Sequence, residues 1–267
     1  MELKKPKVMG ILNATPDSYY DGGNYNNISA AIDYVGQMIT DGVSIIDIGG
    51  YSSRPGADDV TEVEEIDRVI PIIDEIVNEF PQSILSIDTF RHQVAMAAIN
   101  AGAHIVNDIS AGKDDTKMYE TVGKLKVPYI MMHKKGTPKT MQVNPKYDNV
   151  ITEVNQYFSE CIEEATGHAI VDLILDPGFG FGKSLSHNWT LLKNLNAISI
   201  FNRPILVGIS RKRMINELLQ VKAKESLNGT LTANTLAILN GANILRVHDV
   251  KPAVELITIM EYYNNNG

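Results

Sequence analysis

The stretch Ile174-Leu-Asp-Pro-Gly-Phe-Gly-Phe-Gly-Lys183 joins an apolar run to an acid and then to alternating glycines. The branched apolar residues of 169–171 and 173–175 are typical of a parallel strand that is buried on both faces. The glycines that follow allow a sharp turn and a close approach of the backbone to a ligand. Asp176, at the carboxyl end of the strand, is costly to desolvate unless another group pairs with it. Taken alone, the pattern also fits an ordinary turn or helix cap, so the rest of the chain has to decide.

Apolar runs alternate with amphipathic segments along the whole sequence. Strands are predicted over residues 7–12, 43–48, 83–87, 103–107, 127–132, 169–175, 204–209 and 243–247. Helices are predicted near 29–41, 61–79, 91–101, 115–125, 148–166, 186–196, 211–220 with 226–240, and 250–262. Eight strand–helix units are the pattern of an α/β protein with the (βα)8 TIM-barrel fold. We predict a single domain over 1–267; a doubly wound sheet is the alternative, and the regular units without a break disfavour it.

Several predicted helices carry their own start and stop signals. Thr61-Glu-Val-Glu64 has the spacing of a capping box. Gly42, Gly102 and Gly241 each stand where a helix should end. Pro252 suits the first turn of the last helix. These signals support the predicted order of elements.

A short repeat places polar residues at the ends of predicted strands. A glycine precedes the polar residue by five positions in the pairs Gly42 and Asp47, Gly102 and Asn107, and Gly241 and Arg246. Alternate strands of a (βα)8 barrel contribute side chains to one interior layer. We therefore expect these three polar residues and Asp176 to share the layer at the mouth of the barrel. Polar residues in all four places indicate a binding site rather than core filling.

The polar residues suggest two kinds of ligand group. An acid beside an amide, such as Asp176 and Asn107, can exchange parallel hydrogen bonds with a flat heterocycle that has an amino-oxo edge. Arg246 could lie on the face of such a ring as a planar cation. A second set of polar residues stands at the starts of loops. These residues could bind phosphate oxygens together with a metal ion such as Mg²⁺. That set comprises Asn13, Arg54, Arg246 and His248, and Arg211-Lys-Arg213 opens a predicted helix whose amides favour negative charge.

Composition excludes several other classes. The net charge of −8 argues against broad affinity for nucleic acid. The sequence contains no run of about 18 apolar residues, the length needed to span a membrane. Residues 1–7 lead into a predicted strand and lack the apolar segment of a secretory signal. The single cysteine, Cys161, lies on an apolar helical stripe and is predicted to be core. We expect a soluble cytoplasmic protein.

The longer loops are of two kinds. Loops 13–27 and 49–59 exceed what a connection requires and carry Asp21, Ser53 and Arg54, so we predict mobile lids. The loop 133–149, with four lysines, is predicted to be merely solvated.

No Cys and His set has zinc-site spacing, and the histidines outside the strand ends are predicted to be ordinary surface or core residues. These are His92, His104, His168 and His187.

Seven motifs at strand ends resemble those of the dihydropteroate synthase family, the folate-pathway enzymes that sulfonamide drugs inhibit. They cover the full chain, and seven in order are highly specific. The matching segments are 9–18 with 21–23, 46–50 with 52–56, 86–89, 106–108, 175–183, 210–212 and 246–248. The resemblance implies condensation of 6-hydroxymethyl-7,8-dihydropterin diphosphate with 4-aminobenzoate, release of pyrophosphate, a Mg²⁺ ion and a homodimer.

The resemblance also implies roles for individual residues. Asp88, Asn107, Asp176, Lys212 and Arg246 would bind the pterin. Asn13, Ser53, Arg54, Arg246 and His248 would bind the diphosphate, with Mg²⁺ at Asn13. Tyr19, Ser53, Pro55 and Phe181 would line the aminobenzoate pocket, and we expect Arg213 to bind its carboxylate. Catalysis would depend on Asp88, Lys212, Asp21 and Arg54.

Three residues depart from the family pattern: Tyr19 for the usual Phe, Tyr51 for a common acid and Ser53 for the usual Thr. We expect them to change affinity for aminobenzoate or sulfonamides, not the reaction.

Two alternative functions share part of the sequence pattern. A methyltetrahydrofolate–corrinoid methyltransferase barrel would use Asn107 and Asp176 but would not need the Ser-Arg-Pro-Gly lid. A non-catalytic pterin-binding barrel would be expected to lack some of Arg54, Lys212 or His248.

Overall fold

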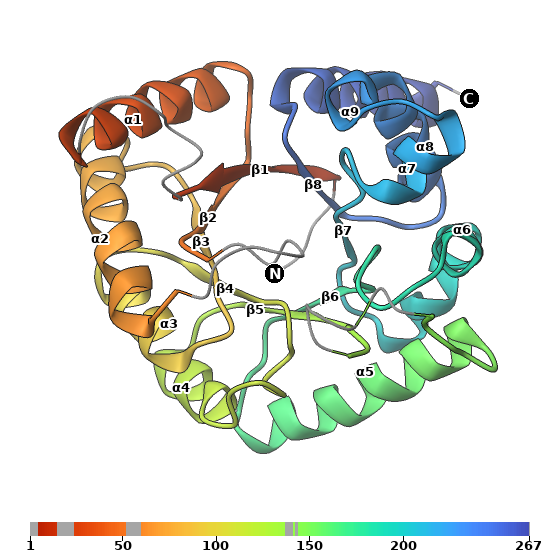
Figure 1. Ribbon diagram of the computed structural model, residues 1–267, viewed down its shortest axis with the longest axis horizontal. Helices are drawn as coiled ribbons and strands as arrows, with labels where there is room; N and C mark the ends of the chain where they lie inside the picture. The colour runs from red at the N-terminus through yellow and green to blue at the C-terminus, as the bar shows by residue number, and fades with distance from the viewer. Residues whose placement is uncertain (1–4, 15–23, 52–59, 137–140, 142–143, 267) are drawn as a thin grey trace.

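A computed structural model describes residues 5–14, 24–51, 60–136, 141 and 144–266. Within these ranges eight parallel strands form one sheet in the order β6-β5-β4-β3-β2-β1-β8-β7. A parallel bridge between Leu175 and Ile205 brings the two edges together. Figure 1 shows the strands in the centre and the helices around them. The (βα)8 barrel predicted from the sequence is confirmed.

The elements follow one another as strand and helix along the chain. The strands are β1 (Lys7–Asn13), β2 (Ile45–Gly49), β3 (Leu85–Asp88), β4 (Ile105–Asp108), β5 (Tyr129–Met132), β6 (Leu173–Asp176), β7 (Leu206–Val207) and β8 (Ile244–Val247). The α-helices are α1 (Asn24–Thr40), α2 (Glu62–Glu79), α3 (His92–Asn100), α4 (Met118–Leu125), α5 (Val150–Gly167), α6 (Leu185–Lys193), α7 (Arg213–Leu219), α8 (Leu227–Leu239) and α9 (Val250–Asn265). Two 3₁₀ segments, η2 (Leu195–Phe201) and η3 (Ala223–Glu225), flank β7 and α7.

The interior of the barrel has an apolar floor. One buried residue from most of the strands forms a separate cluster: Met9, Ile45, Ile105, Ile130, Ile174, Leu206 and Ile244. Side chains on a strand alternate between faces, so residues two positions further along point to the same side. At those positions stand Asp47, Asn107, Asp176 and Arg246. A polar layer therefore lies on the apolar floor, toward the carboxyl ends of the strands, as the repeat predicted.

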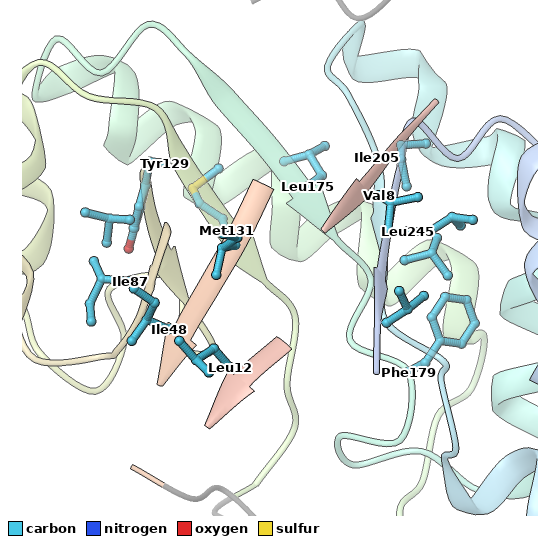
Figure 2. Close-up of a cluster of buried hydrophobic side chains, with 14 of the residues drawn as sticks. Val8, Leu12, Ile48, Ile87, Tyr129, Met131, Leu175, Phe179, Ile205 and Leu245 are labelled. Atoms are coloured by element: carbon cyan, nitrogen blue, oxygen red, sulfur yellow. The ribbon is translucent and has the colours of Figure 1, made fainter. Parts of the chain in front are cut away.

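The opposite faces of the strands pack against the helices. Leu12, Ile48, Ile87, Leu175 and Leu245 are fully buried there, and Figure 2 shows these side chains within the larger core cluster. Both faces of the sheet are thus covered, which is why the strands read as nearly continuous apolar runs. None of the helices that the structure describes combines the length and the apolar composition needed to cross a bilayer.

Local signals are confirmed at several ends of elements. Thr61 and Glu64 form both halves of a capping box at the start of α2. Gly42, Gly102 and Gly241 have φ of 91°, 113° and 99°, a conformation that glycine adopts without strain. Cys161 is fully buried, as predicted.

Several predicted strands begin about two residues too early, and two predictions, for residues 169–175 and 133–149, were wrong in a way that bears on the site. The strand predicted over 169–175 begins only at Leu173, because Ala169 has a left-handed φ of 60° and Val171 is 72% exposed. The loop 133–149 is not merely solvated, since His133 and Met141 are buried. In both places the local apolar or charged composition was outweighed by where the neighbouring elements pack.

Two glycines of neighbouring helices allow a test of the packing. A Cβ at Gly123 in α4 would lie 2.2 Å from the carbonyl oxygen of His168, whereas a Cβ at Gly167 in α5 would meet no atom within 4 Å. We expect Gly123→Ala to destabilise the protein by roughly 2 kcal/mol. Gly167→Ala, the matched control, should leave stability unchanged or raise it by up to about 1 kcal/mol. Urea unfolding would measure both, and equal stabilities of the two variants would contradict the packing.

Candidate active site

A cavity of about 580 Å³ opens at the carboxyl ends of the strands. This volume and position are those of a small-molecule site in a (βα)8 barrel. Its lining residues come from elements far apart in the sequence. They are Ile11, Asn13, Tyr51, Asp88, Met141, Phe179, Gly180, Phe181, Gly208, Ser210, Arg211, Lys212, Arg213, Ala223, Arg246 and His248.

Arg246 is the centre of the charged network beneath the cavity. Its Nε donates to Oδ2 of Asp47 at 2.6 Å, and a terminal nitrogen donates to Oδ2 of Asp88 at 2.6 Å. Asn107 donates from Nδ2 to the same Asp47 oxygen at 3.0 Å. These bonds hold the guanidinium plane between strands β2, β3 and β8. Sequence analysis placed Asp47 in this layer but gave it no role; here it orients both Arg246 and Asn107.

The environment shifts the proton affinities of this network. Burial raises the pKa of Asp88 to about 7, although the Arg246 guanidinium opposes the rise and the carboxylate of Asp47 adds to it. Burial works against the charge of Arg246, but the carboxylates of Asp47 and Asp88 outweigh it and raise the pKa. The network therefore keeps a permanent cation beside an acid that titrates near neutral pH.

Lys212 and Asp176 are two further charged groups near the mouth, and each affects the proton affinity of the other. Lys212 Nζ donates to the carbonyl of Phe179 at 2.7 Å and lies 4.7 Å from the ring centroid of Phe181. Burial lowers the pKa of Lys212 to about 8, and the nearby Asp176 carboxylate opposes this. Burial raises the pKa of Asp176, while Lys212 and the Gly178 amide lower it. A weakly solvated ammonium group thus faces an aromatic wall.

The remaining side of the cavity is suited to anions. Ser210 and His248 contact each other through Oγ and Nδ1 at 3.1 Å, and Asn13 ends β1 nearby in the lining. Arg211 was expected at a helix start, but α7 begins at Arg213. The guanidinium of Arg211 instead donates to both carboxylate oxygens of Asp249, at 3.0 and 2.5 Å. This ion pair joins the segment that carries Lys212 to the segment that carries His248.

The structure brings together seven of the nine predicted site residues that it describes. Asn13, Asp88, Phe181, Lys212, Arg213, Arg246 and His248 all line the cavity. Asn107 and Asp176 are 4% and 6% exposed and are not part of its lining. Asn107 is linked to the cavity through Asp47 and Arg246. Tyr19, Asp21, Ser53, Arg54 and Pro55 lie outside the described residues.

Sequence analysis missed several residues of the site region. Tyr51 was noted only as a departure from a pattern, yet it lines the cavity together with Met141. Lys183 and His133 are buried and hydrogen-bonded to each other, and neither received a role. The position of Lys183 directly after the alternating glycines was the available signal.

Comparison with known proteins agrees with this geometry. Residues 9–248 match the family model of pterin binding enzymes. The dihydropteroate synthase of Escherichia coli K12 is 47% identical over 263 residues, which cover 98% of this chain and 93% of that protein.

Two solved structures share the whole fold. The Yersinia pestis dihydropteroate synthase in a sulfonamide drug complex has a TM-score of 0.93 and 42% identity, covering 99% of this chain and 96% of that one. The Xanthomonas albilineans dihydropteroate synthase with 4-aminobenzoic acid has a TM-score of 0.92 and 39% identity, covering 99% and 95%. This chain belongs to the dihydropteroate synthase family of pterin binding enzymes.

Proposed function

We propose that the cavity joins 6-hydroxymethyl-7,8-dihydropterin diphosphate to 4-aminobenzoate and releases pyrophosphate. The observation that carries this assignment is the fixed guanidinium of Arg246, which lies among acids, with Lys212 and His248 lining the same cavity. Such a site offers hydrogen-bonding groups for a flat ring and cations for a leaving anion.

The pterin would lie over Arg246 in this proposal. Both carboxylates that bind Arg246 fix the plane of its guanidinium, and a fixed planar cation can stack on a ring with little loss of entropy. Asp88, Asn107 and Asp176 would bind the amino-oxo edge and ring nitrogens, and Lys212 would donate to a ring acceptor. The apolar floor beneath supports all of them from below.

The diphosphate would occupy the side of the cavity lined by Asn13, Arg246 and His248. The family resemblance adds Ser53 and Arg54, which lie outside the described residues, as further diphosphate ligands. Among the described residues, no group of three or more His, Cys, Asp or Glu is placed to hold a metal ion by itself. This fits Mg²⁺, which keeps several waters and binds through substrate phosphates and few protein ligands. Asn13 would supply the protein oxygen, and the bound ion would neutralise charge on the leaving pyrophosphate.

The residues of the site then account for the reaction. The bond between the pterin methylene carbon and the diphosphate oxygen breaks, and its electron pair leaves with pyrophosphate. The resulting cation is delocalised over the ring and is stabilised by the carboxylates below it. The neutral amine of 4-aminobenzoate attacks that carbon and then loses a proton, so no strong base is required. Phe181 would form a wall for the benzene ring, and Arg213 would bind the carboxylate.

An apolar surface supports the proposed homodimer. The large apolar side chains exposed on α7, α8 and α9 are Leu218, Leu219, Leu236, Leu239, Ile259, Tyr262 and Tyr263. Figure 1 shows the three helices side by side. Apolar patches of this kind commonly mark protein interfaces, and a second copy of the chain would cover it symmetrically. We also propose a cytoplasmic location, which rests on the sequence.

The assigned role of Lys212 can be tested by its loss. We expect Lys212→Met to lower the rate of pyrophosphate release by at least about 100-fold, because a charge aimed at the reacting groups is removed. The assay contains both substrates and Mg²⁺. Lys222→Met, at an exposed position, is the control and should keep full activity. No release by the unaltered chain would refute the proposed reaction itself.

The role of Arg213 can be tested with two variants that should change the KM for 4-aminobenzoate in opposite directions. Its Nε donates to Glu217 at 2.7 Å, and its side chain is 73% exposed. Arg213→Ala should raise the KM for 4-aminobenzoate about tenfold, a loss of about 1.4 kcal/mol. Glu217→Gln releases the guanidinium from its partner and should lower that KM. If both variants leave this KM unchanged, Arg213 does not bind the carboxylate.

The dimer prediction concerns one charge in the apolar patch. Leu239→Glu places a carboxylate at the proposed interface, so we expect a shift from dimer to monomer in sedimentation experiments. Ile84→Glu, at an exposed apolar position outside the patch, should leave the dimer intact. An unaltered chain that sediments as a monomer would contradict the proposal.

A further inference from the structure

The ammonium group of Lys183 is buried among hydrogen-bond acceptors. The residue is 2% exposed. Its Nζ lies 2.8 Å from His133 Nδ1, 2.9 Å from the carbonyl oxygen of Gly178 and 3.2 Å from that of Phe181. The carbonyl oxygen of His133 lies further from Nζ, at 3.5 Å. A lysine ammonium has three N–H donors, so the three nearer acceptors can use all of them. The site is built around a charged lysine, although no step of the proposed reaction uses it.

The two carbonyls belong to the turn that follows β6, residues 177–182, which we call the glycine turn. Its glycines, Gly178, Gly180 and Gly182, have φ of 67°, 82° and 67°. A Cβ at Gly178 would lie 1.9 Å from the His133 carbonyl oxygen, and one at Gly182 would lie 2.2 Å from that of Lys135. The glycine turn therefore packs directly on the segment after β5, and Lys183 bonds both segments.

The glycine turn carries groups of the proposed site. The Gly178 amide donates to Oδ1 of Asp176 at 2.7 Å. The Phe179 carbonyl accepts from Lys212 at 2.7 Å, and the Phe181 ring lies against the same ammonium group. Lys183 holds the carbonyls on either side of Phe179, so the two lysines fix the turn from two directions.

We propose that Lys183 is a positioning residue, which sets Phe181 and Asp176 through the glycine turn and thereby controls the affinity for 4-aminobenzoate. This inference rests on the proposed placement of the two substrates. It assigns no contact between Lys183 and either substrate, because Lys183 is not part of the cavity lining.

Because several hydrogen-bond acceptors surround Lys183 Nζ, we expect the effect of Lys183 on the affinity for 4-aminobenzoate to depend on pH. The charged and titratable groups near Lys183 are Asp176, Lys212, His133 and His187, with Lys135 beside His133. Burial lowers the pKa of Lys183 to about 7, against the attraction of Asp176. Burial also lowers the pKa of His133 to about 2, so its ring is neutral and Nδ1 accepts. The charged lysine has three donors, whereas the neutral amine has two donors and one lone pair. Its contact with His133 is then kept only if the imidazole moves its proton to Nδ1 and donates to the amine.

The first experiment compares Lys183→Met with Lys193→Met, a lysine at the exposed end of the next helix. At pH 6.5 we expect Lys183→Met to raise the KM for 4-aminobenzoate about tenfold while kcat changes less than about threefold. The control should match the unaltered chain. In the unaltered chain this KM should rise between pH 6.5 and 8.5. In Lys183→Met the rise should be smaller, and what is left reports the titration of Asp88 and Lys212. An unchanged KM for 4-aminobenzoate in a folded Lys183→Met variant would overturn the inference.

A second pair of variants tests the acceptor count without removing the lysine. His133→Leu deletes one acceptor, so the neutral amine satisfies both carbonyls and the rise in KM above pH 7 should become smaller than in the unaltered chain. His133→Asn offers an amide oxygen in its place and should restore the rise. The same pH profile in both variants would contradict the role of the third hydrogen bond. These variants also keep the inference testable if Lys183→Met does not fold.

Two further readouts separate this inference from the proposed function. Phe181→Ala should raise the KM for 4-aminobenzoate if this substrate binds against Phe181, as proposed. An unchanged KM in this variant would refute the proposed position of the substrate, independently of the role of Lys183. Hydrogen exchange requires no activity. The Gly178 and Gly180 amides, bonded to Asp176 and Asn188, should exchange at least tenfold faster in Lys183→Met, with amides of α9 unchanged. Protection equal to that of the unaltered chain would refute the structural link.

Discussion

The structure depends on the pairing of Arg246 with Asp47 and Asp88. Asp47 is completely buried, and an unpaired carboxylate in that position would be expensive to desolvate. The guanidinium offers donors in a fixed planar arrangement that can bind two carboxylates at once. Because the three residues come from β8, β2 and β3, the pairing requires those strands to be close to their observed register. The same bonds that make the buried charges tolerable also fix the plane of the cation.

Charge balance extends across the whole mouth. Asp47, Asp88 and Asp176 supply three carboxylates, and Arg246, Lys212 and Lys183 supply three cations. Each lysine donates to backbone carbonyls, and the charge of Asp176 favours its protonated form. Burial brings the pKa of Asp88 to about 7 and that of Lys212 to about 8. A site of this kind can accept a charged substrate with a small proton rearrangement near neutral pH.

Much of this arrangement follows from local sequence. Gly42 and Gly241 predict where a helix ends, and Asp47 and Arg246, five residues later, predict the polar end of the next strand. The same five-residue spacing therefore covers both the turn and the strand. The identity of the ion-pair partners does not follow from it. Asp47 and Arg246 are far apart in sequence, and only closure of the barrel brings them together. The strand predicted at 169–175 was too long for a similar reason, since exposure of Val171 depends on what packs beside it.

Lys183 shows where sequence reasoning stops and geometry begins. A lysine after a glycine-rich turn would ordinarily be expected in solvent; the alternating glycines single out the position but do not predict that its side chain is buried. The tight contacts of Gly178 and Gly182 with the carbonyls of His133 and Lys135 bring two segments together, and His133 is then in reach of the ammonium group. Glycine in the turn is therefore required for packing as well as for backbone conformation. The glycines allow the turn to lie against the segment after β5, and the buried lysine bonds it there, so the precision of the aromatic wall depends on both.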